Sequence, residues 1–206
     1  MRNAWDVRHR LVLEQISADL MTAGVGVHIE PGALDPRPLR HLGDGLPQPD
    51  QLITFVAARA NGILKRVATD ISVKEAVTRA TVNAGRSVSA CLEERVREKN
   101  AIHLEAARAA GCEFVPLVFT SLGRMHEITE KWLKLDDMAL DERLLQRIGS
   151  GRREFTARLI DGVSCALARG NARILYFVCA EIARARMRAQ APPDQDGRGD
   201  WEGLAP

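Results

Sequence analysis

Two β-rich runs around an Asn61-Gly62 pair constrain the fold of this chain more than any other feature. The runs are QLITFVA (51–57) and ILKRVATDISV (63–73). Asn-Gly between two such runs is a strong hairpin signal, because both residues accept the positive φ that a tight turn needs. Paired antiparallel strands return to the level at which they began. We therefore expect Asp50, just before the first run, to lie near Asp70, late in the second.

The segments around this hairpin predict an α/β fold. Apolar residues at helical spacing predict a helix from about 7 to 23, and a short alternating run follows at 25–31. A second long helix, 85–110, ends at Gly111, a residue that suits the left-handed position after a helix, and leads into the apolar run 112–123. A strand–helix–strand order predicts that its two strands are parallel neighbours in one sheet.

The remainder of the chain is predicted to be helical and basic, and then polar. We expect a helix near 124–135, an acidic break, and a helical hairpin from Arg152 to Ala189 with RGN (169–171) as its turn or kink. Residues 150–190 carry eight arginines against three acids, whereas the Pro/Gly-rich end is acidic and is expected to be disordered. The predicted division is a core at 1–135, a basic helical extension at 136–190 and a disordered tail at 191–206.

Three polar residues of the 85–110 helix stand on or beside its apolar stripe: Arg95, Lys99 and His103. Two carboxylates at one end of a sheet, with a cation on a neighbouring helix, are the minimum apparatus for metal-assisted phosphodiester hydrolysis. A purely structural interpretation stays open, in which Asp50 caps a turn, Asp70 binds strand-end amides and Lys99 extends to solvent.

The order of the motifs resembles the restriction-like endonuclease region downstream of the reverse transcriptase in non-LTR retrotransposon polyproteins. The resemblance covers roughly residues 7–178. It rests on Arg8-His9 opening the first helix, Pro49-Asp50 before a strand, VATDISV in the next strand, Lys99 and His103 on the long helix, AARAAGCEFVPLVFTSLGR, and the closing CALARGNARIL.

That family is similar to the PD-(D/E)xK nucleases. The resemblance implies a restriction-endonuclease-like mixed sheet flanked by helices, with a C-terminal helical extension. It also implies Mg²⁺-dependent or Mn²⁺-dependent nicking of DNA, with Asp50 as the aspartate of the PD pair and Asp70 as the second metal-binding carboxylate. The nick would expose a 3′ hydroxyl for priming reverse transcription.

The resemblance also assigns the catalytic cation. Ser72 stands where the ordinary PD-(D/E)xK pattern has lysine. In the retrotransposon version the lysine is displaced to the following helix in a K-x-x-x-Y arrangement, which Lys99 matches, while His103 stands where tyrosine is usual. Lys74, on the continuation of the strand, is a competing candidate for the cation.

The expected partner is DNA, with RNA or a reverse transcriptase supplied in trans as further partners. The net charge is only +2, so any nucleic-acid surface must be a local basic patch. Two other functions fit the same residues: a catalytically inactive nucleic-acid-binding module and a helical protein-interaction module. The arginines expected to grip the phosphate backbone are Arg152, Arg153, Arg158, Arg169 and Arg173.

Other features predict an intracellular protein without a membrane span, nuclear if it is eukaryotic and functional. No apolar run approaches the roughly 18 residues of a membrane span. The four cysteines lack the spacing of a metal site and are predicted to be buried thiols. On the first helix, His9 is predicted to be a surface histidine, and Glu14 a solvated charge or, alternatively, a remote metal ligand.

Overall fold

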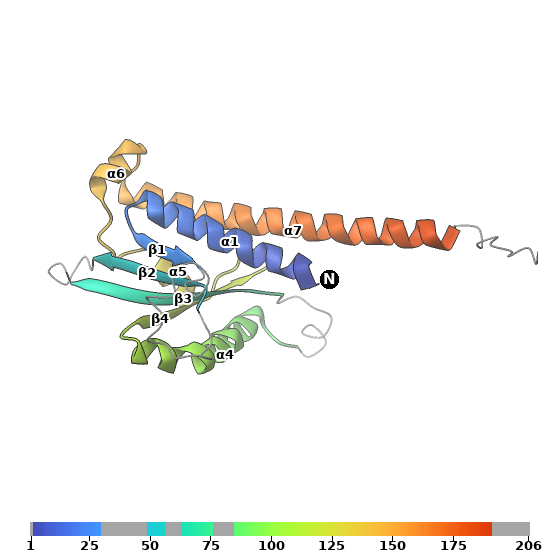
Figure 1. The fold of residues 1–206 in the computed structure, drawn as a ribbon, viewed down its shortest axis with the longest axis horizontal. Coiled ribbons are helices and arrows are strands. Elements are labelled where there is room, and N and C mark those ends of the chain that lie inside the picture. Colours follow the sequence, from blue (N-terminus) through green and yellow to red (C-terminus); the bar gives the residue numbers. More distant parts are fainter. Residues whose placement is uncertain (1, 30–48, 57–62, 76–84, 191–206) are drawn as a thin grey trace, which may run out of the picture.

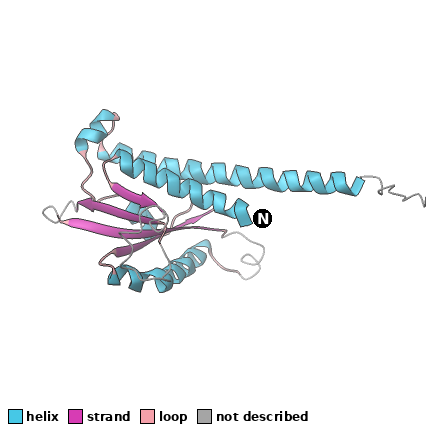
Figure 2. Ribbon diagram, in the orientation of Figure 1, coloured by secondary structure: helices cyan, strands magenta, loops and turns pink. Residues whose placement is uncertain are grey.

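A four-stranded mixed sheet with helices on both faces forms the body of the protein (Figures 1 and 2). The computed structural model describes residues 2–29, 49–56, 63–75 and 85–190. The elements, in chain order, are α1 (Arg2–Thr22), β1 (Gly26–Ile29), β2 (Gln51–Val56), β3 (Leu64–Lys74), α4 (Val88–Ala109), β4 (Glu113–Thr120), α5 (Glu127–Leu133), α6 (Glu142–Arg147) and α7 (Arg152–Gln190).

The strands lie in the order β1-β2-β3-β4. The predicted antiparallel pairing of the two β-rich runs is confirmed, with Gln51 opposite Thr69, although the Asn61-Gly62 turn lies outside the described residues. The predicted parallel pair is also confirmed, because β3 and β4 run side by side in the same direction and α4 connects them. A parallel pair needs such a crossover, whereas the antiparallel pairs do not.

The alternation of side chains along β3 separates the two faces of the sheet. Val67 and Ile71 enter the larger core, which α1, α5 and α7 cover, whereas Ala68 packs with Ala107 of α4 in a smaller cluster. Successive side chains of a strand point to opposite faces, so Asp70 and Ser72 share the α4 face with Ala68. Figure 1 shows α1 and α7 on one side of the sheet and α4 on the other.

The end of α4 follows the signal predicted at Gly111, and its start is capped by Ser87, which was not predicted. The Ser87 side chain accepts a hydrogen bond from the Ala90 backbone N–H at 3.1 Å, which satisfies one of the donors left free at a helix start. Gly111, at φ +67°, follows the last turn in the left-handed conformation, which costs a residue without Cβ little.

The helical hairpin predicted for Arg152 to Ala189 is wrong, because α7 is one continuous helix of 39 residues. Gly170 lies inside this helix and makes no turn. A Cβ at Gly170 would lie 2.5 Å from Arg8 Cγ and 3.0 Å from Arg8 Cα. The glycine therefore permits a close approach of α7 to α1, and this packing offsets the roughly 1 kcal/mol that glycine costs inside a helix.

We expect Gly170→Ala to destabilise the protein by about 1–3 kcal/mol, because the new methyl group overpacks the contact with Arg8. Chemical denaturation followed by circular dichroism would measure this change. Gly151→Ala is the matched control, since a Cβ at Gly151 would meet nothing within 4 Å. If both variants were as stable as the wild type, the close approach of α1 and α7 at Gly170 would not contribute to the free energy of unfolding.

The division into a core at 1–135 and an extension at 136–190 remains a prediction. The first half of α7 nevertheless contributes Phe155, Leu159 and Val163 to the larger core. The short helix α6 follows the acidic break and was not predicted, and the tail at 191–206 lies outside the described residues.

Two further expectations concern cysteines and membranes. Cys91 and Cys112 are buried as predicted, but Cys165 and Cys179 are exposed, so the prediction is wrong for these two, which lie on α7 away from its buried side. Among the helices of the described residues, none combines the length and hydropathy that crossing a membrane requires.

Candidate active site

Asp50 lies at the entrance of β2, directly across from Asp70 of β3. The last paired residues are Gln51 and Thr69, so extending this register by one position sets the two aspartates opposite each other. The Asp50 carboxylate accepts a hydrogen bond from the Ile71 backbone N–H, with Oδ2 2.6 Å from the nitrogen. This hydrogen bond offsets part of the free energy that it costs to remove the Asp50 carboxylate from water beside an apolar strand.

Asp70 is buried and holds two side chains of α4. Its Oδ1 lies 2.6 Å from Lys99 Nζ, and its Oδ2 lies 2.7 Å from His103 Nε2. Burial by itself would raise the pKa of Asp70, but the hydrogen bond from His103 and the contact with Lys99 outweigh burial and lower the pKa below 3.8. Asp70 is therefore an anion in the folded protein at neutral pH.

Contacts with β3 explain why three polar residues lie on or beside the apolar side of α4. Arg95, Lys99 and His103 are spaced by one helical turn each and contact Asp70 and Ser72 of β3. Arg95 Nε donates to Ser72 Oγ at 2.6 Å. An arginine from the helix therefore lies beside Ser72, and the sequence interpretation gave this arginine no role at the site.

His103 is fixed by its surroundings as well as by Asp70. The ring packs against Phe114, with the two ring centroids 5.2 Å apart. Its Nδ1 is buried and has no hydrogen-bond partner within the described part of the chain. A proton on Nδ1 would be an unsatisfied buried donor, so this environment favours the tautomer in which Nε2–H donates to Asp70.

His9 of α1 is part of the same cluster, and the prediction of a simple surface histidine is wrong. Its Nε2 lies 2.8 Å from Asp50 Oδ2, and its side chain is one-third exposed (33%). Burial, the largest influence, lowers the pKa of His9, but the hydrogen bond to Asp50 and the charges of Asp50 and Asp70 together raise it above 6.5. Since Lys99 also acts on this pKa, the groups around the two aspartates share one electrostatic environment.

The raised pKa of His9 predicts how its contribution to stability depends on pH. Protonated His9 stabilises the fold fully below its unfolded pKa near 6.5, and this contribution is lost as the pH rises through the folded pKa. The difference in unfolding free energy between wild type and His9→Gln should therefore shrink from pH 6 to above pH 8. Urea unfolding at several pH values measures it, and a difference that grows with pH would contradict the pairing.

The donor set suits a hard cation that keeps much of its own water. Asp50 and Asp70 supply carboxylate oxygens, the ligands that Mg²⁺ prefers. Within the described residues, no group of three or more His, Cys, Asp or Glu side chains is arranged to hold a metal ion. Mg²⁺ commonly binds through one or two carboxylates with water and substrate phosphate completing its shell, so two aspartates are compatible with it.

The structure also places Lys74, the competing candidate for the cation, and the arginines of α7 that were predicted to bind phosphate. Lys99 contacts Asp70, whereas Lys74 lies further along β3 and interacts electrostatically with Glu98. On α7, Arg152 donates to the Leu135 and Met138 carbonyls at 2.9 and 2.8 Å, so its guanidinium is engaged in holding the loop before α6. The other predicted phosphate-binding arginines are exposed: Arg153, Arg158, Arg169 and Arg173.

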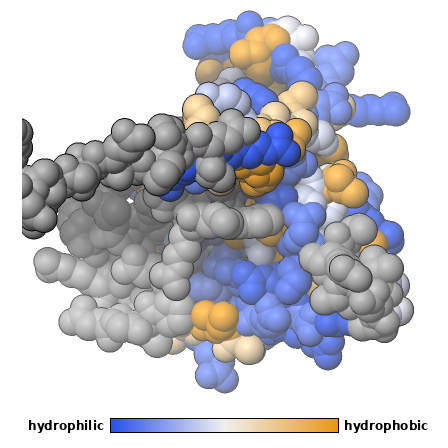
Figure 3. All heavy atoms as spheres, turned by 90° about the vertical axis from the view of Figure 1, so that its right-hand side faces the viewer, coloured by the Kyte–Doolittle hydropathy of each residue, from blue (hydrophilic) through white to orange (hydrophobic). Residues whose placement is uncertain are grey.

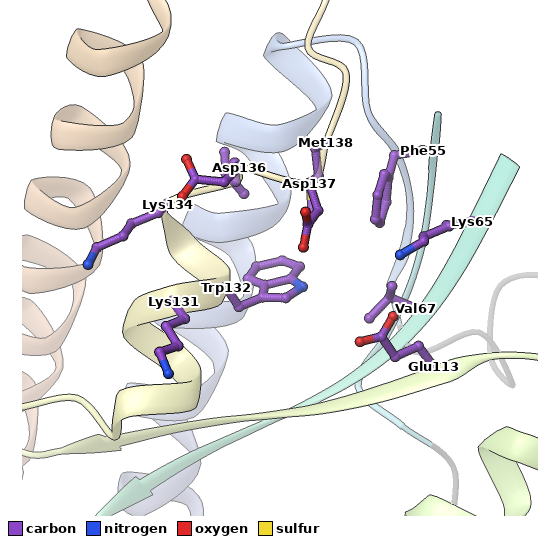
Figure 4. A pocket seen from close by; sticks show the side chains of 11 residues that line it. Phe55, Lys65, Val67, Glu113, Lys131, Trp132, Lys134, Asp136, Asp137 and Met138 are labelled. Carbon is purple, nitrogen blue, oxygen red and sulfur yellow. The ribbon is translucent and has the colours of Figure 1, made fainter. Parts of the chain in front are cut away.

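A cavity of about 360 Å³ lies on the other face of the sheet from Asp70 (Figure 4). Trp132 of α5 and Phe55 of β2 point into it, and Lys65 and Glu113 lie at its sheet side. Asp50, Asp70 and Lys99 are not among its lining residues. The cavity and the carboxylate cluster are therefore separate features.

Comparisons with protein-family models, with curated proteins and with solved structures found no match to this chain. The case for a function therefore rests on the residues themselves.

Proposed function

We propose that this protein is a metal-dependent DNA endonuclease that nicks one strand by phosphodiester hydrolysis. The observation that carries the proposal is the pair formed by Asp50, just before β2, and the buried Asp70 of β3, with Lys99 2.6 Å from Asp70. A half-buried lysine and two histidines also contact the two aspartates, which is more positive charge than a strand-capping role requires. The finer assignments, a restriction-endonuclease-like fold and a retrotransposon origin, belong to this proposal and follow the sequence resemblance.

Each residue has a role in this proposal. Asp50 and Asp70 would hold Mg²⁺ or Mn²⁺, which when bound activates water and stabilises negative charge on the phosphate. Lys99 holds Asp70 ionised and adds positive charge beside the scissile phosphate. His9 orients Asp50 through its hydrogen bond, and His103 orients Asp70.

The experiment that tests the proposal is nicking of supercoiled plasmid by the purified protein. We expect open-circular product with Mg²⁺ or Mn²⁺ and none with EDTA. The exposed arginines of α7 would bind the DNA backbone, so nicking should weaken as salt increases. A folded protein that binds the plasmid but does not nick it with either metal would refute the proposal.

A catalytically inactive nucleic-acid-binding module is the second candidate. It is favoured by the fact that both carboxylate oxygens of Asp70 already have partners, Lys99 and His103. In that case the cluster stabilises the fold, and DNA affinity depends on salt but not on Mg²⁺. Fluorescence anisotropy with labelled DNA, with and without Mg²⁺, separates the two candidates.

A further inference from the structure

The contacts between β3 and α4 continue one step beyond the aspartate pair. Asp70, Ser72 and Lys74 alternate along β3, so all three belong to the face of the strand that α4 covers. Lys99 contacts Asp70, and Arg95, one helical turn earlier, contacts Ser72. Two residues of a strand and four residues of a helix both rise by about 6–7 Å. Arg95 and Lys74 are therefore neighbours of the candidate active site, and the proposed hydrolysis gives neither of them a role.

The guanidinium of Arg95 is held in a fixed direction. Its Nε donates to Ser72 Oγ at 2.6 Å, and its Nη1 lies 2.7 Å from Glu98 Oε2. The donors of an arginine form a rigid planar fork, so the bond from Nε also fixes where Nη1 and Nη2 point. The Arg95 side chain is 31% exposed, so solvent reaches it. This fork is oriented for the oxygens of an anion, and a carboxylate already occupies it.

Glu98 is the anion that the neighbouring cations share. The hydrogen bond from Arg95 is the largest influence and lowers the pKa of Glu98; burial opposes it, and the charges of Arg95, Lys74 and Lys99 add to it. Lys99 has Asp70 as its own partner. Within the described part of the chain, Arg95 and Lys74 have no anionic partner other than Glu98. Two cations, one from α4 and one from β3, therefore depend on a single carboxylate.

A phosphodiester is able to replace that carboxylate. The Glu98 side chain is 41% exposed, and partly exposed ion pairs of this kind contribute little to stability. A phosphodiester also carries one negative charge and presents two oxygens, which match the fork of an arginine. Figure 3 looks onto the end of the molecule at which β3 ends and α4 begins, and the described surface in the lower half of this view is mostly hydrophilic. Such a surface suits a charged strand of nucleic acid.

We propose that Arg95 and Lys74 bind a phosphate of the nicked DNA strand, and that Glu98 occupies this phosphate site in the free protein. The inference rests on the proposed endonuclease function, which sets the scissile phosphate beside Lys99. Because Arg95 lies one helical turn from Lys99, the phosphate that it binds is a neighbour of the scissile one. DNA then displaces Glu98 from Arg95 as the strand enters the site.

Glu98→Gln distinguishes this site from a purely structural ion pair. We expect the variant to bind a labelled DNA duplex at least about threefold more tightly than its control, because the competing charge is gone. The matched control is Glu94→Gln, which removes the same charge from the Arg86–Glu94 pair on the same helix, 2.8 Å long and similarly exposed. Fluorescence anisotropy measures both affinities. Equal affinities would show that only net charge matters and would overturn the proposal.

Removal of the cations should have the opposite effect. Arg95→Ala and Lys74→Ala are each expected to weaken DNA binding about tenfold and to reduce the dependence of log affinity on log salt by about one. Arg86→Ala, the control on the same helix, should change neither quantity. Circular dichroism verifies that each variant is folded, and the gain of affinity in Glu98→Gln tests the site without removing a cation.

Nicking and binding together separate this site from the function on which it rests. If the wild type nicks plasmid while Arg95→Ala and Lys74→Ala bind DNA like Arg86→Ala, the endonuclease stands and the phosphate site is overturned. If the wild type binds without nicking while the two variants lose affinity as expected, the phosphate site stands and the endonuclease is refuted. A folded protein that binds no DNA, with or without Mg²⁺, overturns both.

Discussion

Asp70→Asn is expected to lower metal-dependent nicking by at least roughly 100-fold, the scale of losing one preorganised electrostatic contact. The amide keeps the shape of the carboxylate but removes the charge that would hold the metal ion and that pairs with Lys99. Asp50→Asn should have a similar effect. The measurement is the initial rate of open-circle formation from supercoiled plasmid at saturating Mg²⁺, with folding of each variant verified by circular dichroism.

Asp137→Asn is the matched control. It makes the same chemical change at an exposed carboxylate that lines the cavity near Trp132, away from the aspartate pair. We expect it to nick at the rate of the wild type. If Asp70→Asn nicked as fast as this control, Asp70 would be a structural anion and the inactive binding module would be the better interpretation.

That the two aspartates lie near each other could be predicted, because a hairpin returns to the level at which it began. The exact register could not be predicted, since a two-residue turn at Asn61-Gly62 would set Asp50 opposite Val73, whereas the observed pairing of Gln51 with Thr69 sets it opposite Asp70. The resemblance assigns Lys99 and His103 to the site, and their position beside the apolar stripe of a helix indicates that they need polar partners. That both of them contact Asp70 is seen only in the structure.

His9 and Gly170 show what the sequence could not reveal. The contact of His9 with Asp50 joins residues 41 positions apart, and the packing of α1 that creates it has no local signature. Gly170 followed by Asn171 carries the composition of a turn, but α7 continues because Gly170 packs against Arg8 and Asn171 donates to Ser121. Tertiary contacts override a weak helix propensity here.

Lys99→Met is expected to cost about 3–5 kcal/mol of unfolding free energy at neutral pH, because it leaves the Asp70 charge buried with one partner fewer. The double variant Asp70→Asn/Lys99→Met should be markedly more stable than Lys99→Met, since removing both charges removes the desolvation penalty too. Urea unfolding of the wild type, both single variants and the double variant gives the coupling energy. Identical costs for the single and double variants would mean that the pair is not coupled.

The same set of variants gives a test with pH, because the pKa of Asp70 is lowered below 3.8 in the folded protein. A carboxyl group with a lowered pKa adds stability that is complete above its unfolded pKa and is lost as the pH falls through the folded value. The advantage of the wild type over Asp70→Asn should therefore hold from neutral pH to about pH 5 and shrink below pH 4. An advantage that instead persists unchanged into strong acid would show that the charge of Asp70 is not what holds α4 against β3.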